Sequence, residues 1–328
     1  MEQSPVLITG ATGFVGANVV AKAAERGWRT LALDLAPPES SVEALWRPHR
    51  ELIEFVCGDV KDRPLLERLI SVHGVQQVVH GATITPDARL ETEDPIPTLE
   101  VGVLGTAATL WAARSLVAGR IVLLSSGSIY KPVSSDDAVL DEGSPLRTSG
   151  IYPLTKICGE WMARQLSREG SMNIVSARVA ACYGPLERNT GSRTTMSAVW
   201  QMVRSAREDG YIVLSDRERT LDFTHVQDIA AGVCHLLAAP SLDYETYNIS
   251  SGSGYTYQRL AECVARTVPG TQIIHASDNG NTEIGSDKGN RRGRLDINRI
   301  QTDTDFKPQY DLLSGVEQYV GWLEEHDF

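Results

Sequence analysis

The sequence of 328 residues predicts an α/β fold: a doubly wound parallel sheet with a second, smaller α/β domain. Along its first half, apolar segments of β type alternate with helical segments, which is the pattern of parallel strands joined by right-handed crossovers. Each β segment is almost continuously apolar, as in a sheet covered by helices on both faces. The expected strands are residues 6–9, 30–33, 53–57, 77–80, 120–124, 175–179 and a strand near 247–249.

A change in composition marks the second domain. After Pro185 the sequence becomes polar and rich in arginine and threonine, and the chain is longer than a usual single domain. We therefore expect the main domain to comprise residues 1–184 and 222–252, and the second domain residues 185–221 and 253–328.

Composition restricts the class of protein. The chain is 42% apolar and 22% charged, as is usual for globular proteins. A net charge of −11 and a pI near 5.2 argue against binding to nucleic acid or an anionic membrane, because both need basic patches. The N-terminus has no basic region, and Gly10 interrupts its apolar segment too early for a signal peptide or a membrane span. The five cysteines are scattered without metal-ligand spacing, so we expect a reduced, cytoplasmic protein without a metal.

The strongest motif is a glycine turn directly after the first expected strand. Gly10, Gly13 and Gly16 are spaced G-x-x-G-x-x-G, ahead of an amphipathic helix. Such a strand–turn–helix unit binds a dinucleotide, because the glycines let the backbone approach a pyrophosphate and the N–H groups of the helix N-terminus face the phosphates. We expect Gly10, Gly13, Phe14, Val15 and Gly16 to bind this cofactor.

Asp34 indicates which dinucleotide is bound. It ends the second expected strand, about 20 residues after the first glycine, where a carboxylate binds the hydroxyls of the adenosine ribose. A carboxylate at this position favours NAD over NADP.

A tyrosine and a lysine four residues apart form the second motif. Tyr152 and Lys156 share one face at the start of an expected helix. A tyrosine hydroxyl normally loses its proton near pH 10, but a neighbouring ammonium and a positively charged nicotinamide both favour the phenolate. We therefore expect Tyr152 to act as a general base.

The third motif is an apolar strand that ends in Ser125 and Ser126 and is followed by Ser128. Ligands of an open parallel sheet bind at the carboxyl ends of its strands, so these hydroxyls are expected beside the cofactor. Ser125 and Ser128 also suit a turn that caps the strand, whereas Ser126 is the better candidate for catalysis. Ser126 and Ser128 are both candidate substrate ligands.

These motifs resemble those of the extended short-chain dehydrogenase/reductases, also called NAD-dependent epimerase/dehydratases. Three further elements follow in the family's order and extend the resemblance over nearly the whole chain: residues 58–60 (Gly-Asp-Val), Arg178 with residues 183–185 (Tyr-Gly-Pro), and residues 222–228. The resemblance implies a Rossmann-type domain in which Asp59 hydrogen-bonds the adenine amino group, Val60 packs on the adenine ring and Ala82 lines the nicotinamide ribose.

The resemblance also implies a mechanism. Ser126 would orient the substrate oxygen, and Lys156 would bind the nicotinamide ribose and lower the pKa of Tyr152. Tyr152 would then remove the proton of a substrate hydroxyl while a hydride passes to NAD. The implied catalytic residues are Ser126, Tyr152 and Lys156.

The sequence departs from the family at positions that bear on the substrate. Ala181 and Leu221 stand where the family's motifs have an asparagine and an arginine that contact a nucleotide-sugar, so polar contacts to a diphosphate are lost. A nucleotide-sugar stays an alternative substrate, since Arg219, Arg291, Arg292 or Arg294 could supply the missing contacts. Arg193 and Arg219 are candidate ligands for a substrate carboxylate, which the planar guanidinium suits; a solvated, salt-bridged loop is the alternative for each. Gly102 replaces another family asparagine, and we expect it to serve close packing.

We expect an enzyme that oxidises a hydroxyl of a sugar, sugar acid or related polyol. An epimerase with a transient keto intermediate is favoured over a net dehydrogenase, and a non-catalytic NAD-binding regulator is a remote alternative. No Asp-Glu pair follows Ser126, which argues against a 4,6-dehydratase. The glycine- and charge-rich stretch from Asp278 to Arg294 is expected to form a loop over the active site.

A homodimer is also expected. The helices over 99–113 and 152–166 resemble the pair through which the family often dimerises. Internal packing is the alternative for the apolar side chains on these helices, which are Trp111, Ile157, Trp161 and Met162.

Overall fold

A seven-stranded sheet forms the centre of the computed structural model, which describes residues 4–116, 119–135, 137–147, 149–170, 172–275, 284 and 291–326. All neighbouring strands are parallel, in the order β12-β7-β5-β4-β1-β2-β3. The predicted doubly wound fold is confirmed, and the strand order changes direction at β1 and β4, where such sheets open a crevice for ligands. The strands are β1 (Val6–Thr9), β2 (Thr30–Asp34), β3 (Ile53–Cys57), β4 (Gln77–His80), β5 (Arg120–Ser126), β7 (Asn173–Val179) and β12 (Thr246–Ile249).

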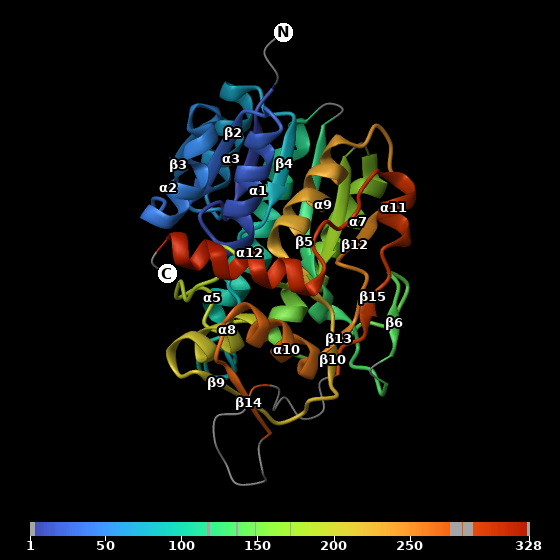
Figure 1. Cartoon of the computed structure of the whole chain (residues 1–328). Helices are drawn as coiled ribbons and strands as arrows, with labels where there is room; N and C mark the ends of the chain where they lie inside the picture. The colour runs from blue at the N-terminus through green and yellow to red at the C-terminus, as the bar shows by residue number, and fades with distance from the viewer. Residues whose placement is uncertain are drawn as a thin grey trace.

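Strand β1 shows how the two faces of the sheet are covered. Its side chains alternate, so that Val6 and Ile8 enter one apolar core and Leu7 enters the other. Figure 1 shows α1 and α9 side by side in front of the sheet. The first core includes residues of α1 (Phe14–Glu25), α2 (Ser40–Trp46) and α9 (Val226–Ala238), and the second includes residues of α3 (Arg63–His73), α6 (Thr106–Ala112) and α7 (Ile151–Gly170).

A second lobe lies below the sheet in Figure 1. It contains α8 (Ala198–Glu208), α10 (Tyr257–Thr267) and the parallel pair β9 (Tyr211–Leu214) and β14 (Gln272–His275). Helix α12 (Leu312–Glu325) packs on α10 and crosses the molecule between this lobe and the sheet. Three short strand pairs complete the connections: β8 (Ala181–Tyr183) with β11 (Phe223–His225), β10 (Thr220–Leu221) with β13 (Tyr255–Thr256), and β6 (Val139–Leu140) with β15 (Arg294–Leu295).

The domain boundaries stay a prediction. Helix α11 (Asn298–Asp303) belongs to the segment assigned to the second domain, yet it packs against β12 of the main sheet. Most of the stretch from Asp278 to Arg294 lies outside the described residues. The remaining helical elements are α4 (Ala88–Glu93), α5 (Ile96–Leu99), η1 (Arg47–Leu52), η2 (Glu100–Gly105), η3 (Ala113–Ser115) and η4 (Gly127–Ile129).

One helical stretch passes a length and composition test for a membrane span. It runs over Ile96–Ser115 and joins α5, the π-helical η2, α6 and η3. In the molecule it packs against α3 and α7, and an apolar helix in the core of a globular domain passes the same test. The stretch is therefore weak evidence for a span, and the expected cytoplasmic location stays a prediction.

Candidate active site

The glycine turn is shaped so that no side chain fits at its two ends. Gly10 has φ +69°, and a Cβ there would lie 2.7 Å from the backbone nitrogen of Ala82. A Cβ on Gly16 would lie 1.9 Å from the carbonyl oxygen of Gly10. A Cβ on Gly13 would lie 3.3 Å from the same oxygen. Strand, turn and helix α1 thus form a bare-backbone cradle that fits the pyrophosphate of a dinucleotide.

Two carboxylates lie at the carboxyl ends of β2 and β3. Asp34 accepts hydrogen bonds from the backbone N–H of Thr12 at 2.9 Å and of Leu35 at 2.8 Å, which fixes its carboxylate beside the glycine turn. Asp59 accepts from the N–H of Lys61 at 2.9 Å. Val60 is buried, and a Cβ on Gly105 would lie 2.7 Å from it. The ribose and adenine roles of these residues stay predictions.

The N-terminus of α7 presents the catalytic candidates. Tyr152 lies in the first turn of this helix, and the hydroxyls of Ser126 at the end of β5 and of Thr85 in the segment after β4 are close enough to act on the pKa of its phenol. Glu91 of α4 accepts hydrogen bonds from the backbone N–H groups of Ile151 and Tyr152. Ser126 and Tyr152, predicted separately from two motifs, therefore meet in one site.

Lys156 is buried next to Tyr152. Its ammonium lies 5.6 Å from the centroid of the Tyr152 ring and donates a hydrogen bond of 3.0 Å to the carbonyl oxygen of Leu124 on β5. Burial lowers the pKa of Lys156 to about 8. The lysine thus links helix α7 to strand β5, and its role as a ligand of the nicotinamide ribose stays a prediction.

The pKa of Tyr152 differs from the expectation. Burial raises it above its ordinary value of 10, because the phenolate loses its hydration. The hydroxyls of Ser126 and Thr85 and the charge of Arg193 oppose this rise without cancelling it. In the protein without NAD, the pKa of Tyr152 is therefore not lowered as predicted, because the effect of burial is larger than that of the neighbouring groups.

A buried ion pair between Arg178 and Glu160 lies next to the site. Both ends of the Arg178 guanidinium donate to the Glu160 carboxylate, at 2.9 and 2.7 Å, and Ser125 donates to the same carboxylate at 2.6 Å. Arg178 also donates to the hydroxyl of Tyr130. Ser125 is thus structural, as its turn position allowed, and the network holds β5, β7 and α7 together. Glu160 was not singled out from the sequence, because a glutamate inside a helix carries no local signal.

Gly102 confirms the expectation of close packing. It lies in η2 against the catalytic helix, and a Cβ there would lie 2.7 Å from the Cβ of Thr155. The missing side chain lets η2 approach α7 directly between Tyr152 and Lys156.

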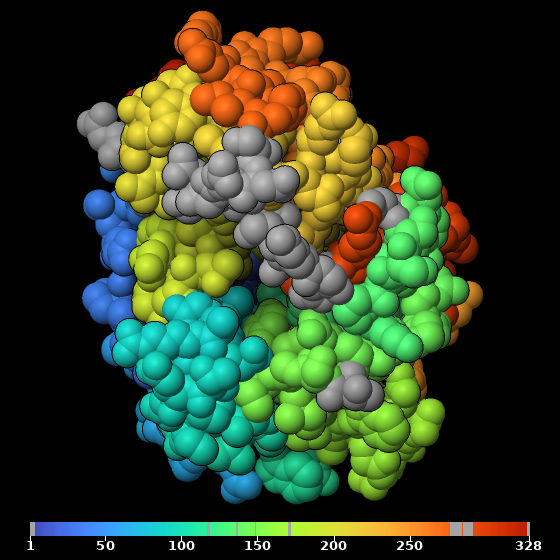
Figure 2. Space-filling model, turned by 90° about the horizontal axis from the view of Figure 1, so that it is seen from below, coloured from blue at the N-terminus to red at the C-terminus, as the bar shows by residue number. Residues whose placement is uncertain are grey.

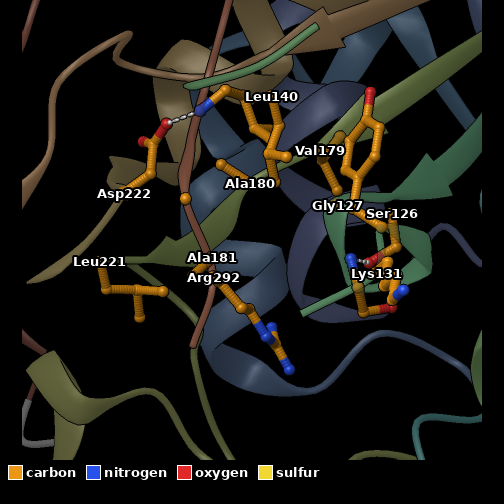
Figure 3. A pocket seen from close by; sticks show the side chains of 14 residues that line it. Ser126, Gly127, Lys131, Leu140, Val179, Ala180, Ala181, Leu221, Asp222 and Arg292 are labelled. Carbon is orange, nitrogen blue, oxygen red and sulfur yellow. Dashed lines mark hydrogen bonds between the residues drawn. The ribbon is translucent and has the colours of Figure 1, made fainter. Parts of the chain in front are cut away.

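A small cavity of about 40 Å³ opens at the end of β5. Figure 3 shows Leu221, Ala181 and Arg292 on one side of it, across from Ser126 and Lys131. Seen from below, the surface is hollowed between the segment that contains α4 and α5, the residues before α8 and the residues before α7 (Figure 2). The lining residues are Ser126, Gly127, Ser128, Tyr130, Lys131, Leu140, Val179, Ala180, Ala181, Leu221, Asp222, Arg292, Gly293 and Leu295.

The structure places the predicted substrate ligands in different surroundings. Ser128 lines the cavity, and its hydroxyl oxygen has no hydrogen-bond partner within the described part of the chain. Arg193 lies near Tyr152, and its charge acts on the pKa of the phenol. Arg219 is buried against the ring of Tyr257, 5.7 Å from its centroid, and is not among the residues that line the cavity. Its role as a substrate ligand stays a prediction.

The second lobe also contacts the segment after β4 that lies beside Tyr152. The N–H of Thr85 donates a hydrogen bond of 2.7 Å to the carbonyl oxygen of Ser192, and Thr85 pairs with Arg193 in a short β-bridge. Neither contact has a signature in the sequence, because it joins segments over 100 residues apart.

The fold and the site together define a dinucleotide-dependent protein of the short-chain dehydrogenase/reductase type. The chain belongs to the NAD-dependent epimerase/dehydratase family, whose model matches residues 6–250, and NAD is its cofactor. It is 26% identical over 326 residues to dTDP-4-dehydro-6-deoxy-D-allose reductase of Streptomyces bikiniensis, covering 98% of this chain and 96% of the relative. It is 24% identical over 356 residues to dTDP-L-rhamnose 4-epimerase of Burkholderia thailandensis, covering 98% and 95%.

Solved structures agree on the fold. UDP-glucose 4-epimerase of Stenotrophomonas maltophila, crystallised with NAD and formylated UDP-arabinopyranose, superposes with a TM-score of 0.85 at 19% identity and covers 99% of both chains. These relatives include both epimerases and reductases, so family membership defines the cofactor and leaves the reaction open.

Proposed function

We propose that this protein oxidises a hydroxyl of a sugar, sugar acid or related polyol, with Tyr152 as the general base. The observation that carries the proposal is the meeting of Ser126, Tyr152 and Lys156 at the carboxyl end of β5, where the Ser126 hydroxyl is close enough to act on the pKa of Tyr152 and Lys156 donates to the carbonyl of Leu124. A catalytic base must lie within hydrogen-bond reach of the proton that it removes, and a substrate hydroxyl between Ser126 and Tyr152 meets this condition.

The residues divide the work. Ser126 holds the substrate oxygen, and the Tyr152 phenolate accepts the proton of the hydroxyl as the carbon–oxygen bond becomes a carbonyl. Bound NAD supplies the hydride acceptor, so oxidation yields a ketone and NADH. Lys156 places a positive charge 5.6 Å from the phenol ring and so favours the phenolate.

An epimerase is the favoured form of this activity, because the same site can return the hydride to the opposite face of a transient ketone. A net dehydrogenase or reductase is the second candidate, and the reductase among the relatives supports it. A non-catalytic regulator is disfavoured, since a regulator needs neither the tyrosine nor its place beside Ser126 and Lys156.

One assay separates these forms. The purified chain is incubated with NAD and a panel of sugars, sugar acids and polyols, and NADH absorbance and epimer formation are followed together. Epimerisation without net NADH supports the epimerase; steady NADH formation without an epimer replaces it by the dehydrogenase. A panel with neither product, for a chain that binds NAD, rejects the proposed activity.

We also propose that the protein is a homodimer. The face formed by α5, η2, α6 and α7 exposes two tryptophans, Trp111 at 46% and Trp161 at 64%, together with Leu104 and Leu154. An exposed apolar patch of this kind is typical of a protein interface. Ile157 and Met162, predicted as part of it, are half-buried.

A further inference from the structure

Arg193 lies between the cofactor turn and the catalytic tyrosine. Its guanidinium carbon is 5.3 Å from the centroid of the Phe14 ring, at the start of α1 directly after the glycine turn. Its charge lowers the pKa of Tyr152 and of the Cys182 thiol, so the guanidinium is within electrostatic range of both groups. The Arg193 side chain is 23% exposed, so a small molecule can reach it.

A fully buried carboxylate holds one part of this guanidinium. Glu187 is 0% exposed, and its Oε1 atom accepts a hydrogen bond of 2.9 Å from Nη2 of Arg193. The same carboxylate accepts from the backbone N–H and the hydroxyl of Ser197, at 2.6 and 2.7 Å. Glu187 follows Leu186, the one non-glycine residue with positive φ in the part of the chain that the structure describes. Backbone strain of this kind is retained where the surrounding structure needs one geometry.

The rest of the guanidinium is unsatisfied. Nε of Arg193 is shielded from solvent and has no hydrogen-bond partner among the described residues. An unpaired buried N–H is costly, and such groups in folded proteins call for an explanation. Nε lies on the same edge of the guanidinium as the Nη2 that binds Glu187, so Nη1 is the donor that points away from Glu187, and it makes no hydrogen bond within the described part of the chain. An arginine that is held at one edge and has a free donor at its far end, beside the proposed base, is suited to accept a ligand.

We infer that the substrate is a sugar acid whose carboxylate lies close to the reacting hydroxyl, and that Arg193, held by Glu187, binds that carboxylate. The inference rests on the proposed function and narrows its substrate class. A carboxylate matches the planar donor set of arginine, and a charge-assisted hydrogen bond is stronger than one to a neutral hydroxyl. With the guanidinium beside Tyr152, the bound carboxylate would direct one particular hydroxyl to the base.

The cavity at the end of β5, which Ser126 lines and Arg193 does not, also carries groups that suit an acidic substrate without a nucleotide. Its lining includes the cations Lys131 and Arg292 and one carboxylate, Asp222, against a net charge of −11 for the chain. The Asp222 oxygens already accept from Leu295, Thr224 and Ser251. The wall formed by Ala181 and Leu221 has no polar side-chain atom for a diphosphate (Figure 3).

The test compares three groups of substrates with the purified full-length chain and NAD: aldonates and uronates, the corresponding neutral sugars, and UDP-glucose with UDP-glucuronate. Thermal stabilisation is measured beside turnover, because a bound ligand stabilises the folded state even when it is not converted. Arg193→Lys keeps the charge without the planar fork, and Arg193→Gln removes the charge. Arg204→Gln is the matched control, since Arg204 is an exposed arginine that pairs with Glu208 on α8.

A sugar acid should be converted or bound best, and Arg193→Gln should raise its KM or Kd by roughly 10- to 100-fold, the loss of one hydrogen bond to a charged group. Arg193→Lys should fall between the wild type and Arg193→Gln. Arg204→Gln should leave both substrates unaffected, and the two Arg193 variants should change the Kd of the neutral sugar far less than that of the sugar acid. The inference is overturned if neutral sugars are used equally well, if UDP-sugars are preferred, or if sugar-acid binding does not depend on Arg193. In each of these cases, NAD-dependent turnover of any probe would still support the proposed function. A different result would reject the proposed function: the chain binds NAD but converts none of the probes. The carboxylate site would still be supported in that case if a sugar acid bound in a way that depends on Arg193.

Discussion

The backbone N–H of Tyr152 donates a hydrogen bond of 3.2 Å to Oε1 of Glu91. The N–H of Ile151 donates to the same oxygen, so a carboxylate from α4 caps the N-terminus of the catalytic helix. A negative charge there also compensates the positive end of the helix dipole. Glu91 contacts the backbone and leaves the phenol free, which makes it a positioning residue.

Glu91→Ala should therefore lower kcat by about 10- to 100-fold, because a small displacement of a catalytic group is expensive in rate. Stability should fall by about 1 kcal/mol, as for other lost helix caps. Glu91→Gln keeps an acceptor oxygen and should recover most of kcat. The control is Glu93→Ala, which removes an exposed glutamate paired with Arg89 on the same helix. A KM effect with unchanged kcat in Glu91→Ala would contradict the positioning role.

Tyr152→Phe should reduce turnover by at least about 100-fold, since it removes the proposed base and keeps the ring. NAD affinity, measured by calorimetry, should change little. Tyr211→Phe, an exposed tyrosine on β9, is the matched control and should retain full activity. Normal turnover in Tyr152→Phe would remove this residue from the mechanism.

Gly16→Ala should abolish NAD binding, because its Cβ would lie 1.9 Å from the Gly10 carbonyl oxygen and the turn must open to accept it. Gly321→Ala in α12 is the control: no atom lies within 4 Å of its Cβ, and helical glycines are usually stabilised by this change. Fluorescence titration with NADH would measure both. Retained affinity in Gly16→Ala would show that the turn is more adaptable than its geometry implies.

His80 should make the protein less stable in mild acid. It is buried between Thr9 and Thr106, and burial together with the charge of Lys156 lowers its pKa from 6.5 to about 3. Below pH 6.5 the unfolded chain binds a proton that the folded chain does not, so the stability is lost progressively as pH falls from 6.5 towards 3. At pH 5 this amounts to about 2 kcal/mol.

Urea unfolding at pH 7 and pH 5 measures this difference. His80→Gln should lose about 2 kcal/mol less than the wild type on moving to pH 5, whatever its stability at pH 7. His49→Gln, in the surface helix η1, provides the matched control. The same pH difference in His80→Gln and in the wild type would assign the acid sensitivity to other groups.

Trp161→Glu should dissociate the proposed dimer, because a carboxylate would be buried in an apolar interface without a partner. Sedimentation velocity at several protein concentrations would detect the monomer. Val72→Glu changes an exposed apolar residue on α3 and should leave the mass unchanged. A wild-type chain that sediments as a monomer at all concentrations would assign the two tryptophans to some other surface role.

The sheet could be predicted from the sequence because each strand carries its own local signal. All seven predicted strands occur in the sheet, and Gly102 packs as the missing side chain suggested. The contacts that complete the site have no such signal. Glu91 and Glu187 act on residues of other elements, and nothing in their local sequence distinguishes them from surface glutamates.

The same limit applies to the arginines. Arg193 and Arg219 are equivalent as sequence letters, yet one lies by the catalytic tyrosine and the other is buried against Tyr257. The pKa of Tyr152 shows a second limit, because the sequence identifies its charged neighbour but not the depth of burial that opposes it.

The contact between Thr85 and Ser192 couples the position of the second lobe to the pKa of Tyr152. Thr85 is held by a carbonyl of the second lobe, and Arg193 comes from that lobe as well; both oppose the rise in the pKa of Tyr152. Movement of the lobe away from the sheet would withdraw both groups and make the phenol a weaker acid. By thermodynamic linkage, ionisation of the phenol must in turn favour the docked lobe. Ionisation of Tyr152 and docking of the second lobe are thus coupled, so that a change in one shifts the equilibrium of the other.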